Sequence, residues 1–283
     1  MSNVLQKLII FINSVLTYRI SRRILIKYDI PYSHTTTFTL QNQHTNMNII
    51  ITGASKGLGK AMAFKFAATG NTLFLGARNL EQLNATAAEI VNQYPNCKIF
   101  VFSVDVTKKA ELKAFADWCL EQATPDILIN NAGQFLPGSI HDEPEGLLEQ
   151  MITTNLNSAY HLTRMLLPKM IAAAKEKNQP KHIFNICSIA SLQAYANGGS
   201  YSISKYALLG FSKNLREEMK PHQIKVTSVI PGAAYTDSWI GSGVDEKRIM
   251  EANDIATMVY AAAQLSPQAC VEEIVLRPQL GDL

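Results

Sequence analysis

The chain has 283 residues, of which 47% are hydrophobic and 17% are charged, and its formal net charge is +3. This composition predicts a packed core rather than disorder, and the length allows one large α/β domain or two small ones. Four cysteines without paired spacing and six scattered histidines argue against a disulfide framework or a metal site, and they fit a reducing cytosol.

The first 46 residues differ from the rest of the chain. They hold five basic residues and one acid, a net charge of +4, which leaves −1 for residues 47–283 and argues against a nucleic-acid surface there. The apolar stretch 4–16 is too short and too interrupted for a transmembrane helix, and it lacks the order of a signal peptide. Three interpretations stay open: a peripheral membrane anchor, a disordered extension, or an upstream stretch before the true start. We favour a start at Met47, which opens directly onto the first predicted strand.

That strand, 48–51, reads Asn-Ile-Ile-Ile and runs into a glycine-rich turn, after which 60–68 has the apolar spacing of a helix. Strand, glycine turn and helix in this order predict a dinucleotide site. Gly53 allows the tight turn, Gly57 lets the backbone approach a pyrophosphate, and Gly59 lets the helix pack on the strand. The amides at the helix N-terminus then face the phosphate charge.

Strands and helices alternate through the rest of the chain. We expect further strands at 72–76, 99–104, 127–129, 182–187, 225–230 and 271–276, and further helices at 80–93, 108–122, 145–175 (bent near Pro168), 201–219 and 254–265. This alternation predicts a single α/β domain over residues 47–283, a doubly wound, seven-stranded parallel sheet covered on both faces. The least regular segment, 233–251, lies after a strand, where loops often carry specificity.

Tyr201 and Lys205 stand one turn apart on a predicted helix and therefore face the same way. A free phenol has a pKa of about 10 and is a poor acid or base at neutral pH. A fixed ammonium group one turn away is expected to lower that pKa. The pair therefore predicts a proton-transfer device.

With these residues placed, the chain resembles the short-chain dehydrogenase/reductase family over residues 47–283. Residues 52–59 match its TGxxxGxG motif, 130–133 match NNAG, and Pro231-Gly232 with Thr236 match the motif after the sixth strand. Four residues match the catalytic tetrad of the family: Asn155, Ser188, Tyr201 and Lys205.

The resemblance implies hydride transfer between a nicotinamide and a carbonyl or alcohol carbon. It implies that Tyr201 donates the proton while Ser188 holds the same oxygen. Lys205 would hold the ribose and assist Tyr201, and Asn155 would anchor a proton-relay water. Two of these residues have an alternative interpretation. Ser188 could be an ordinary serine that ends a strand, and Asn155 could be an asparagine inside a helix that is bound to a backbone carbonyl. The expected cofactor-binding residues are Gly53, Ser55, Lys56, Gly57, Leu58, Gly59, Arg78, Asp105, Val106, Asn131, Ala132, Gly133, Tyr201, Lys205, Pro231, Gly232 and Thr236.

Charge after the second strand indicates which cofactor binds. An acid there would bind the ribose hydroxyls of NAD, whereas this chain carries Arg78, and Lys56 adds a second cation in the glycine turn. We therefore expect NADP(H), with NAD(H) as the alternative. Asp105 and Val106 resemble the family's adenine-contacting pair, although Asp105 also suits a helix cap.

The sequence thus predicts a cytoplasmic, NADPH-dependent reductase of small or medium-sized ketones, aldehydes or acyl thioesters, without a metal. There are two alternatives. One is a cofactor-binding sensor or scaffold without turnover, and the other is a membrane-associated, lipid-metabolising reductase anchored through residues 1–46 (the leader). Helices 145–175 and 201–219 are expected to pack across the interface of a homodimer or homotetramer. An apolar pocket wall is expected from Phe135, Leu136, Tyr195, Tyr235 and Trp239.

Overall fold

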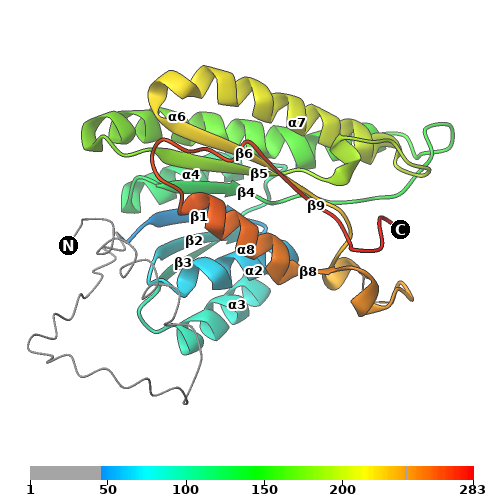
Figure 1. Cartoon of the computed structure of the whole chain (residues 1–283), viewed down its shortest axis with the longest axis horizontal. Helices are drawn as coiled ribbons and strands as arrows, with labels where there is room; N and C mark the ends of the chain where they lie inside the picture. Colours follow the sequence, from blue (N-terminus) through cyan, green and yellow to red (C-terminus); the bar gives the residue numbers. More distant parts are fainter. Residues whose placement is uncertain (1–45, 240) are drawn as a thin grey trace, which may run out of the picture. The chain divides into compact units, whose positions relative to one another are not determined.

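A computed structural model of the chain describes residues 46–239 and 241–283, so the expectations for residues 1–45 lie outside the described residues. Seven parallel strands form one sheet in the order β3-β2-β1-β4-β5-β6-β9 (Figure 1). Their bounds are β1 Asn48–Thr52, β2 Thr72–Ala77, β3 Lys98–Ser103, β4 Ile127–Asn130, β5 Lys181–Ile186, β6 Ile224–Pro231 and β9 Glu273–Leu276. The predicted doubly wound, seven-stranded fold is confirmed.

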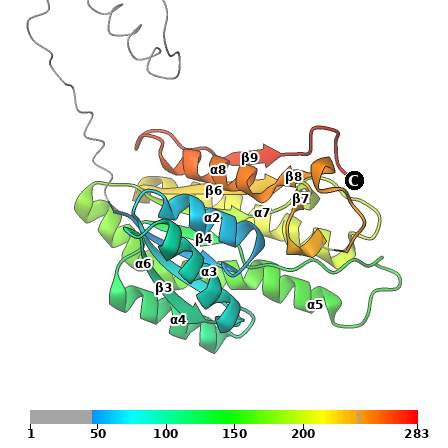
Figure 2. The ribbon, with the colours of Figure 1, turned by 90° about the horizontal axis from the view of Figure 1, so that it is seen from below.

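Helices cover both faces of this sheet. On one face lie α2 (Gly57–Ala67), α3 (Leu80–Gln93) and α8 (Ala252–Ala263), and α2 packs beside α8 (Figure 2). On the other face lie α4 (Lys109–Gln122), α6 (Ser158–Lys177) and α7 (Gly199–Met219). The change in strand order between β1 and β4 leaves a crevice at the carboxyl ends of the strands, which is where such sheets bind ligands.

The first strand shows how the sequence builds two cores at once. Ile49, Ile50 and Ile51 are all fully buried. Ile49 and Ile51 pack with α2 and α8, whereas Ile50 packs with α4 and α6 on the opposite face. Because successive side chains of a strand alternate in direction, a strand covered on both faces needs this continuous apolar run.

The single helix expected over 145–175 is instead two helices joined by a wider turn. α5 spans Leu147–Ile152, the π-helical turn η1 spans Thr153–Asn157, and α6 follows directly. The expected bend near Pro168 is therefore not the main irregularity, since this proline lies inside α6. Side-chain hydroxyls compete for the helix carbonyls here: Thr154 Oγ1 donates to Gln150 O at 2.9 Å, and Ser158 Oγ donates to Thr154 O at 2.5 Å.

The segment 233–251, expected to be the least regular, is anchored at both ends. Two short strands, β7 (Ala234–Tyr235) and β8 (Met250–Glu251), pair in parallel with each other. Short 3₁₀ turns, η4 (Asp237–Trp239) and η5 (Glu246–Arg248), lie between them. Two-residue strands carry too little pattern to be predicted from sequence.

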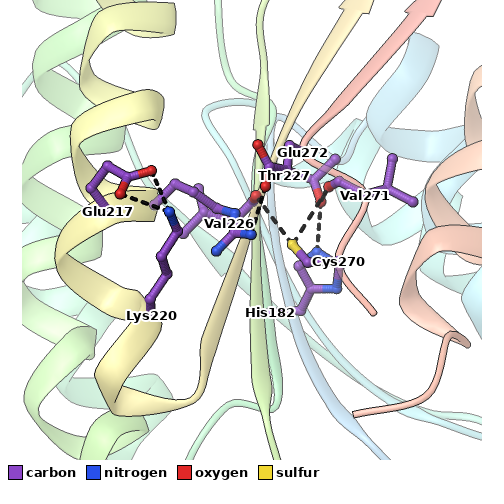
Figure 3. A network of polar contacts seen from close by, with 9 residues as sticks. His182, Glu217, Lys220, Val226, Thr227, Cys270, Val271 and Glu272 are labelled. Carbon is purple, nitrogen blue, oxygen red and sulfur yellow. Dashed lines mark hydrogen bonds and ion pairs between the residues drawn. The ribbon is translucent and has the colours of Figure 1, made fainter. Parts of the chain in front are cut away.

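A buried polar network lies near the amino ends of β5 and β6 (Figure 3). His182 Nε2 lies 2.7 Å from Thr227 Oγ1, which donates to Val271 O at 2.5 Å. Since the hydroxyl has only one hydrogen to donate, His182 Nε2 carries the hydrogen of the first contact. Burial, with the charges of Lys225 and Arg216, lowers the pKa of His182 to about 3, so its ring is neutral at physiological pH.

Candidate active site

A cavity of about 870 Å³ opens at the carboxyl ends of the central strands. It is lined by nearly all of the residues that the sequence singles out: Gly53, Ser55, Lys56, Gly57, Leu58, Arg78, Asp105, Val106, Asn131, Ala132, Gly133, Ser188, Tyr201, Lys205, Pro231, Gly232 and Thr236. The two remaining predicted residues, Gly59 and Asn155, are buried outside this lining. The structure thus brings the glycine turn and the Tyr201–Lys205 pair to one site.

The glycine turn after β1 is shaped to receive an anion. Gly53 and Gly57 adopt positive φ angles of 64° and 54°, and α2 begins at Gly57 with its first amides beside the cavity. A side chain at Gly59 would place its Cβ 2.2 Å from Gly53 O, so only glycine allows α2 to pack this closely. This cradle fits the pyrophosphate of a dinucleotide.

The turn after β4 braces the glycine turn. Asn131 Nδ2 donates to Thr52 O at 2.9 Å and to Gly53 O at 3.1 Å. In return, Thr52 Oγ1 accepts from the backbone amides of Asn131 and Ala132, both at 3.0 Å. Asn131 therefore lines the cavity, and its side chain also holds the glycine turn in place.

At the far end of the crevice, Arg78 follows β2 and is exposed in the cavity wall. Asp105 Oδ1 accepts from Thr107 N at 3.1 Å and Thr107 Oγ1 at 2.7 Å, which closes the turn before α4, whose N-cap is Lys108. Partial burial pushes the pKa of Asp105 up, but the Thr107 hydrogen bonds and the charges of Arg78 and Lys108 outweigh it and hold the pKa below its usual value. The helix-cap alternative is thus wrong by position, since Asp105 closes the preceding turn instead.

The expected effect of Lys205 on Tyr201 is not what their surroundings produce. Burial raises the pKa of Tyr201 to about 12, and its hydrogen-bonding partner Ser188 opposes that rise. Burial also lowers the pKa of Lys205 to about 8. Its Nζ lies 5.8 Å from the centre of the Tyr201 ring and donates to Ile186 O at 2.8 Å. Loss of water around the phenol outweighs the opposing hydrogen bond from Ser188, so the pKa of Tyr201 moves opposite to the predicted direction.

Ser188 lies at the end of a strand, with its hydroxyl held beside Tyr201. It follows β5 and is the N-cap of a 3₁₀ turn, η2 (Ile189–Ser191). Its Oγ accepts from Ala190 N at 3.2 Å, and its own amide donates to Ser191 Oγ at 3.3 Å. This pair of bonds fixes the hydroxyl beside Tyr201.

Asn155 sits in the π-helical turn with 1% of its surface exposed. Its Oδ1 accepts from Gln134 N at 2.8 Å, and its Nδ2 donates to Gln134 O at 3.0 Å and to Ser204 Oγ at 2.9 Å. A Cβ on Gly133 would lie 3.1 Å from Asn155 Oδ1 and 3.6 Å from Lys205 Nζ. Asn155 therefore ties the turn after β4 to α7, close to Lys205.

Aromatic side chains also line the cavity. Phe135, Tyr195 and Trp239 line it as expected, whereas Leu136 and Tyr235 lie outside the lining formed by the described residues. Sequence reasoning missed Gln193 and Asp282, which also line the cavity.

An arginine joins these two residues. Arg277 Nη1 lies 3.0 Å from Asp282 Oδ2, and Arg277 Nη2 donates to Gln193 Oε1 at 2.9 Å. Gln193 and Asp282 are 89 positions apart, so no local pattern links them. Only the sheet brings the end of β9 beside the loop after β5.

Residues 47–246 match the family description "short chain dehydrogenase". The chain belongs to this family. It is accordingly an oxidoreductase of the nicotinamide-dependent type that acts on alcohol or carbonyl groups.

Three known proteins illustrate the relationship. A sepiapterin reductase from Chlorobaculum tepidum is 30% identical over 245 residues, which cover 83% of this chain and 97% of that protein. A metagenomic short-chain oxidoreductase solved in complex with NADP is 31% identical, with a TM-score of 0.70 and coverage of 82% and 97% of the two chains. An alcohol dehydrogenase from Thermococcus sibiricus, complexed with 5-hydroxy-NADP, is 25% identical, with a TM-score of 0.75 and coverage of 83% and 97%. Across residues 46–239 and 241–283 of the present short-chain dehydrogenase, every helix is too short or too polar to cross a membrane.

Proposed function

We propose that this short-chain dehydrogenase is an NADP(H)-dependent carbonyl reductase in which Tyr201 is the general acid. The observation that carries the proposal is the convergence of Ser188, Tyr201 and Lys205 on the cavity that begins at the glycine turn. When bound, the nicotinamide cofactor supplies the hydride. Gly53, Gly57 and the first amides of α2 would hold its pyrophosphate, and Lys205 would hold the adjoining ribose.

The protein residues then manage the charge that develops on the substrate oxygen. Ser188 donates a hydrogen bond to that oxygen, and Tyr201 transfers its phenolic proton to it. A pKa of about 12 keeps Tyr201 protonated and ready to donate at neutral pH. After the transfer, the hydrogen bond from the Ser188 hydroxyl favours the phenolate. The Lys205 ammonium, 5.8 Å from the centre of the ring, is an opposite charge that favours it as well.

Arg78 supports the preference for the phosphorylated cofactor. It lies in the cavity wall directly after β2, where a 2′-phosphate would meet its guanidinium group. Lys56, exposed in the glycine turn, adds a second cation to the lining of this cavity. Two of the similar structures contain NADP or a derivative of it, which agrees with this choice.

The proposed substrates are small or medium-sized ketones, aldehydes or acyl thioesters with an apolar group beside the carbonyl. The aromatic residues Phe135, Tyr195 and Trp239 form the wall that such a group would contact.

We also propose that the active species is a cytoplasmic homodimer or homotetramer. Exposed apolar side chains lie on α5, α6 and α7: Leu148, Tyr160, Ile203 and Tyr206 are 37–46% exposed. Such side chains suit a symmetric interface between copies of these helices.

Four free cysteines support a reducing compartment. Light scattering and partition between membrane and soluble fractions test these two points.

Tyr201→Phe tests the mechanism. The variant keeps the ring and should bind NADPH normally, but it lacks the proton and should lose reduction of a panel of carbonyl compounds, followed by loss of NADPH absorbance. Tyr94→Phe is the control, because Tyr94 is the C-cap of α3 and lies outside the cavity lining and outside the proposed interface helices. Full activity in Tyr201→Phe would refute the general-acid role. Cofactor binding without turnover of any carbonyl by the wild-type chain would favour the sensor alternative.

A further inference from the structure

The start of the catalytic helix is held by a carboxylate from another part of the chain. Glu143 lies in the loop between β4 and α5, 57 positions before Ser200. Ser200 N donates to Glu143 Oε1 at 2.7 Å, and Ser200 Oγ donates to Glu143 Oε2. Ser200 is the second residue of α7 and directly precedes Tyr201.

This contact supplies what the helix itself lacks. The N-cap of α7 is Gly198, which has no side chain to bind the free amides of the first turn, and that turn contains no acidic residue. An acceptor at this position satisfies a free amide, and a negative charge there is favoured by the helix dipole. Glu143 therefore caps α7 from outside the helix.

The backbone around this contact leaves no room for larger residues. A Cβ on Gly199 would lie 1.7 Å from Glu143 Oε1, and a Cβ on Gly138 would lie 2.6 Å from Glu143 Cγ. Gly138 also pairs with Gly198 in an isolated parallel bridge, and Gly138 N donates to Asn197 O at 3.1 Å. Glycine at these positions lets the loop reach the helix start directly.

The same loop also carries a wall of the substrate pocket. Phe135 packs edge-on against the ring of Tyr201, with 4.9 Å between ring centres and 75° between ring planes. The loop after β4 is thus joined to the start of α7 at two places: the Glu143 carboxylate accepts from Ser200, and Phe135 contacts the ring of Tyr201.

We infer that Glu143 is a positioning residue for the proton donor, acting by capping α7 one residue before Tyr201. It holds the first turn of the helix so that the phenol stays between Ser188 and Phe135. This role rests on the proposed function of Tyr201.

The test compares Glu143→Ala with Glu143→Gln and with Glu145→Gln. Glu143→Ala removes both acceptors, and loss of a cap of this kind is expected to lower kcat about tenfold. The glycine turn lies elsewhere in the cavity, so the Kd for NADPH should stay within about twofold of wild type.

Glu143→Gln keeps an oxygen for Ser200 N and offers its amide to Ser200 Oγ, so it should restore kcat to within about threefold of wild type. Glu145 is exposed in the same loop and makes no side-chain hydrogen bond or ion pair with the described residues, so Glu145→Gln should match wild type.

Ser200→Ala approaches the contact from the other side and keeps the test decisive if Glu143→Ala does not fold. It removes only the hydroxyl donor, so kcat should fall by about threefold with unchanged NADPH binding. The double variant Glu143→Ala, Ser200→Ala should be no slower than Glu143→Ala alone, because the two residues act through one contact. Thermal unfolding curves establish that each variant is folded at the assay temperature.

Several outcomes would overturn the inference. They are a folded Glu143→Ala with a kcat within twofold of wild type, an unchanged kcat in Ser200→Ala, and equal losses in Glu143→Ala and Glu145→Gln. Failure of the proposed function looks different: Tyr201→Phe then retains full reductase activity, whatever Glu143 variants do. If Tyr201→Phe is inactive and Glu143→Ala is normal, only the role of Glu143 is lost.

Discussion

The Lys205 ammonium donates its hydrogen bond to the backbone carbonyl of Ile186, the last residue of β5, over 2.8 Å. Lys205 is 6% exposed, and this contact ties α7 to the strand that ends just before Ser188. One lysine thus joins the helix that carries Tyr201 to the strand that positions Ser188. The cost of burying its charge is visible in its pKa, which falls to about 8.

Lys205→Met should abolish reductase activity and stabilise the fold at pH 7. The folded-state pKa of Lys205 lies below the usual 10.5, so its charge destabilises the folded state below pH 8, and this penalty fades as pH rises from 8 to 10.5. A shift of that size corresponds to about 3 kcal/mol, and loss of the bond to Ile186 O offsets about 1 kcal/mol. We expect the free energy of unfolding in urea to rise by about 2 kcal/mol at pH 7.

Lys213→Met is the matched control for that experiment. Lys213 is on the same helix but its side chain is 60% exposed and paired with Glu273, so the substitution should change stability by less than about 0.5 kcal/mol. A Lys205→Met variant that is less stable than wild type at pH 7 would contradict the claim that its charge is buried at a cost.

Arg78→Ala should weaken NADPH without affecting NADH. A hydrogen bond to a charged group contributes about 1.5–3 kcal/mol, so the Kd for NADPH should rise by roughly tenfold to a hundredfold. The Kd values for both cofactors, measured by nucleotide fluorescence, check this. Lys98→Ala serves as control, because Lys98 is exposed at the opposite end of β3. Equal losses for NADPH and NADH in Arg78→Ala would contradict recognition of the 2′-phosphate.

A chain beginning at Met47 should fold and keep its activity. The family match starts at residue 47, and Met47 N already donates to Asn71 Oδ1 at 3.0 Å, beside the start of β2. Expression of residues 47–283 followed by thermal unfolding and the reductase assay checks this. Insoluble protein would show that the leader takes part in folding.

The parts of this molecule that follow from sequence are those set by local geometry. The continuous isoleucine run 49–51 predicts a strand buried on both faces, and the helical period places Lys205 on the same face as Tyr201. Each depends only on residues a few positions apart, so one sequence suffices to predict it.

What the sequence could not predict depends on contacts between distant segments. The pKa of Tyr201 moves opposite to expectation because its burial is decided by residues from other elements. Glu143 and Ser200 are 57 positions apart, and Gln193 and Asp282 are 89 positions apart, so only the folded arrangement brings each pair together. Asn155 lies in a π-helical turn, and its side chain accepts a hydrogen bond from Gln134 N in the loop after β4. The helical spacing of the sequence indicates neither the wider turn nor this contact.

His182 should make the fold sensitive to acid. The pKa of His182 is about 3 in the folded state, below the ordinary 6.5. Between these two values the unfolded chain binds a proton at His182 and the folded chain does not, so stability is lost as pH falls from 6.5 toward 3. Between pH 7 and pH 5 this one group should lower the free energy of unfolding by about 2 kcal/mol. His182→Gln keeps a donor for Thr227 Oγ1 but cannot titrate, so its urea unfolding should depend less on pH, even though the lost stacking on Phe184 lowers its stability overall. His222→Gln, at an exposed position, should keep the wild-type dependence. Parallel pH profiles for wild type and His182→Gln would show that His182 accepts a proton without unfolding.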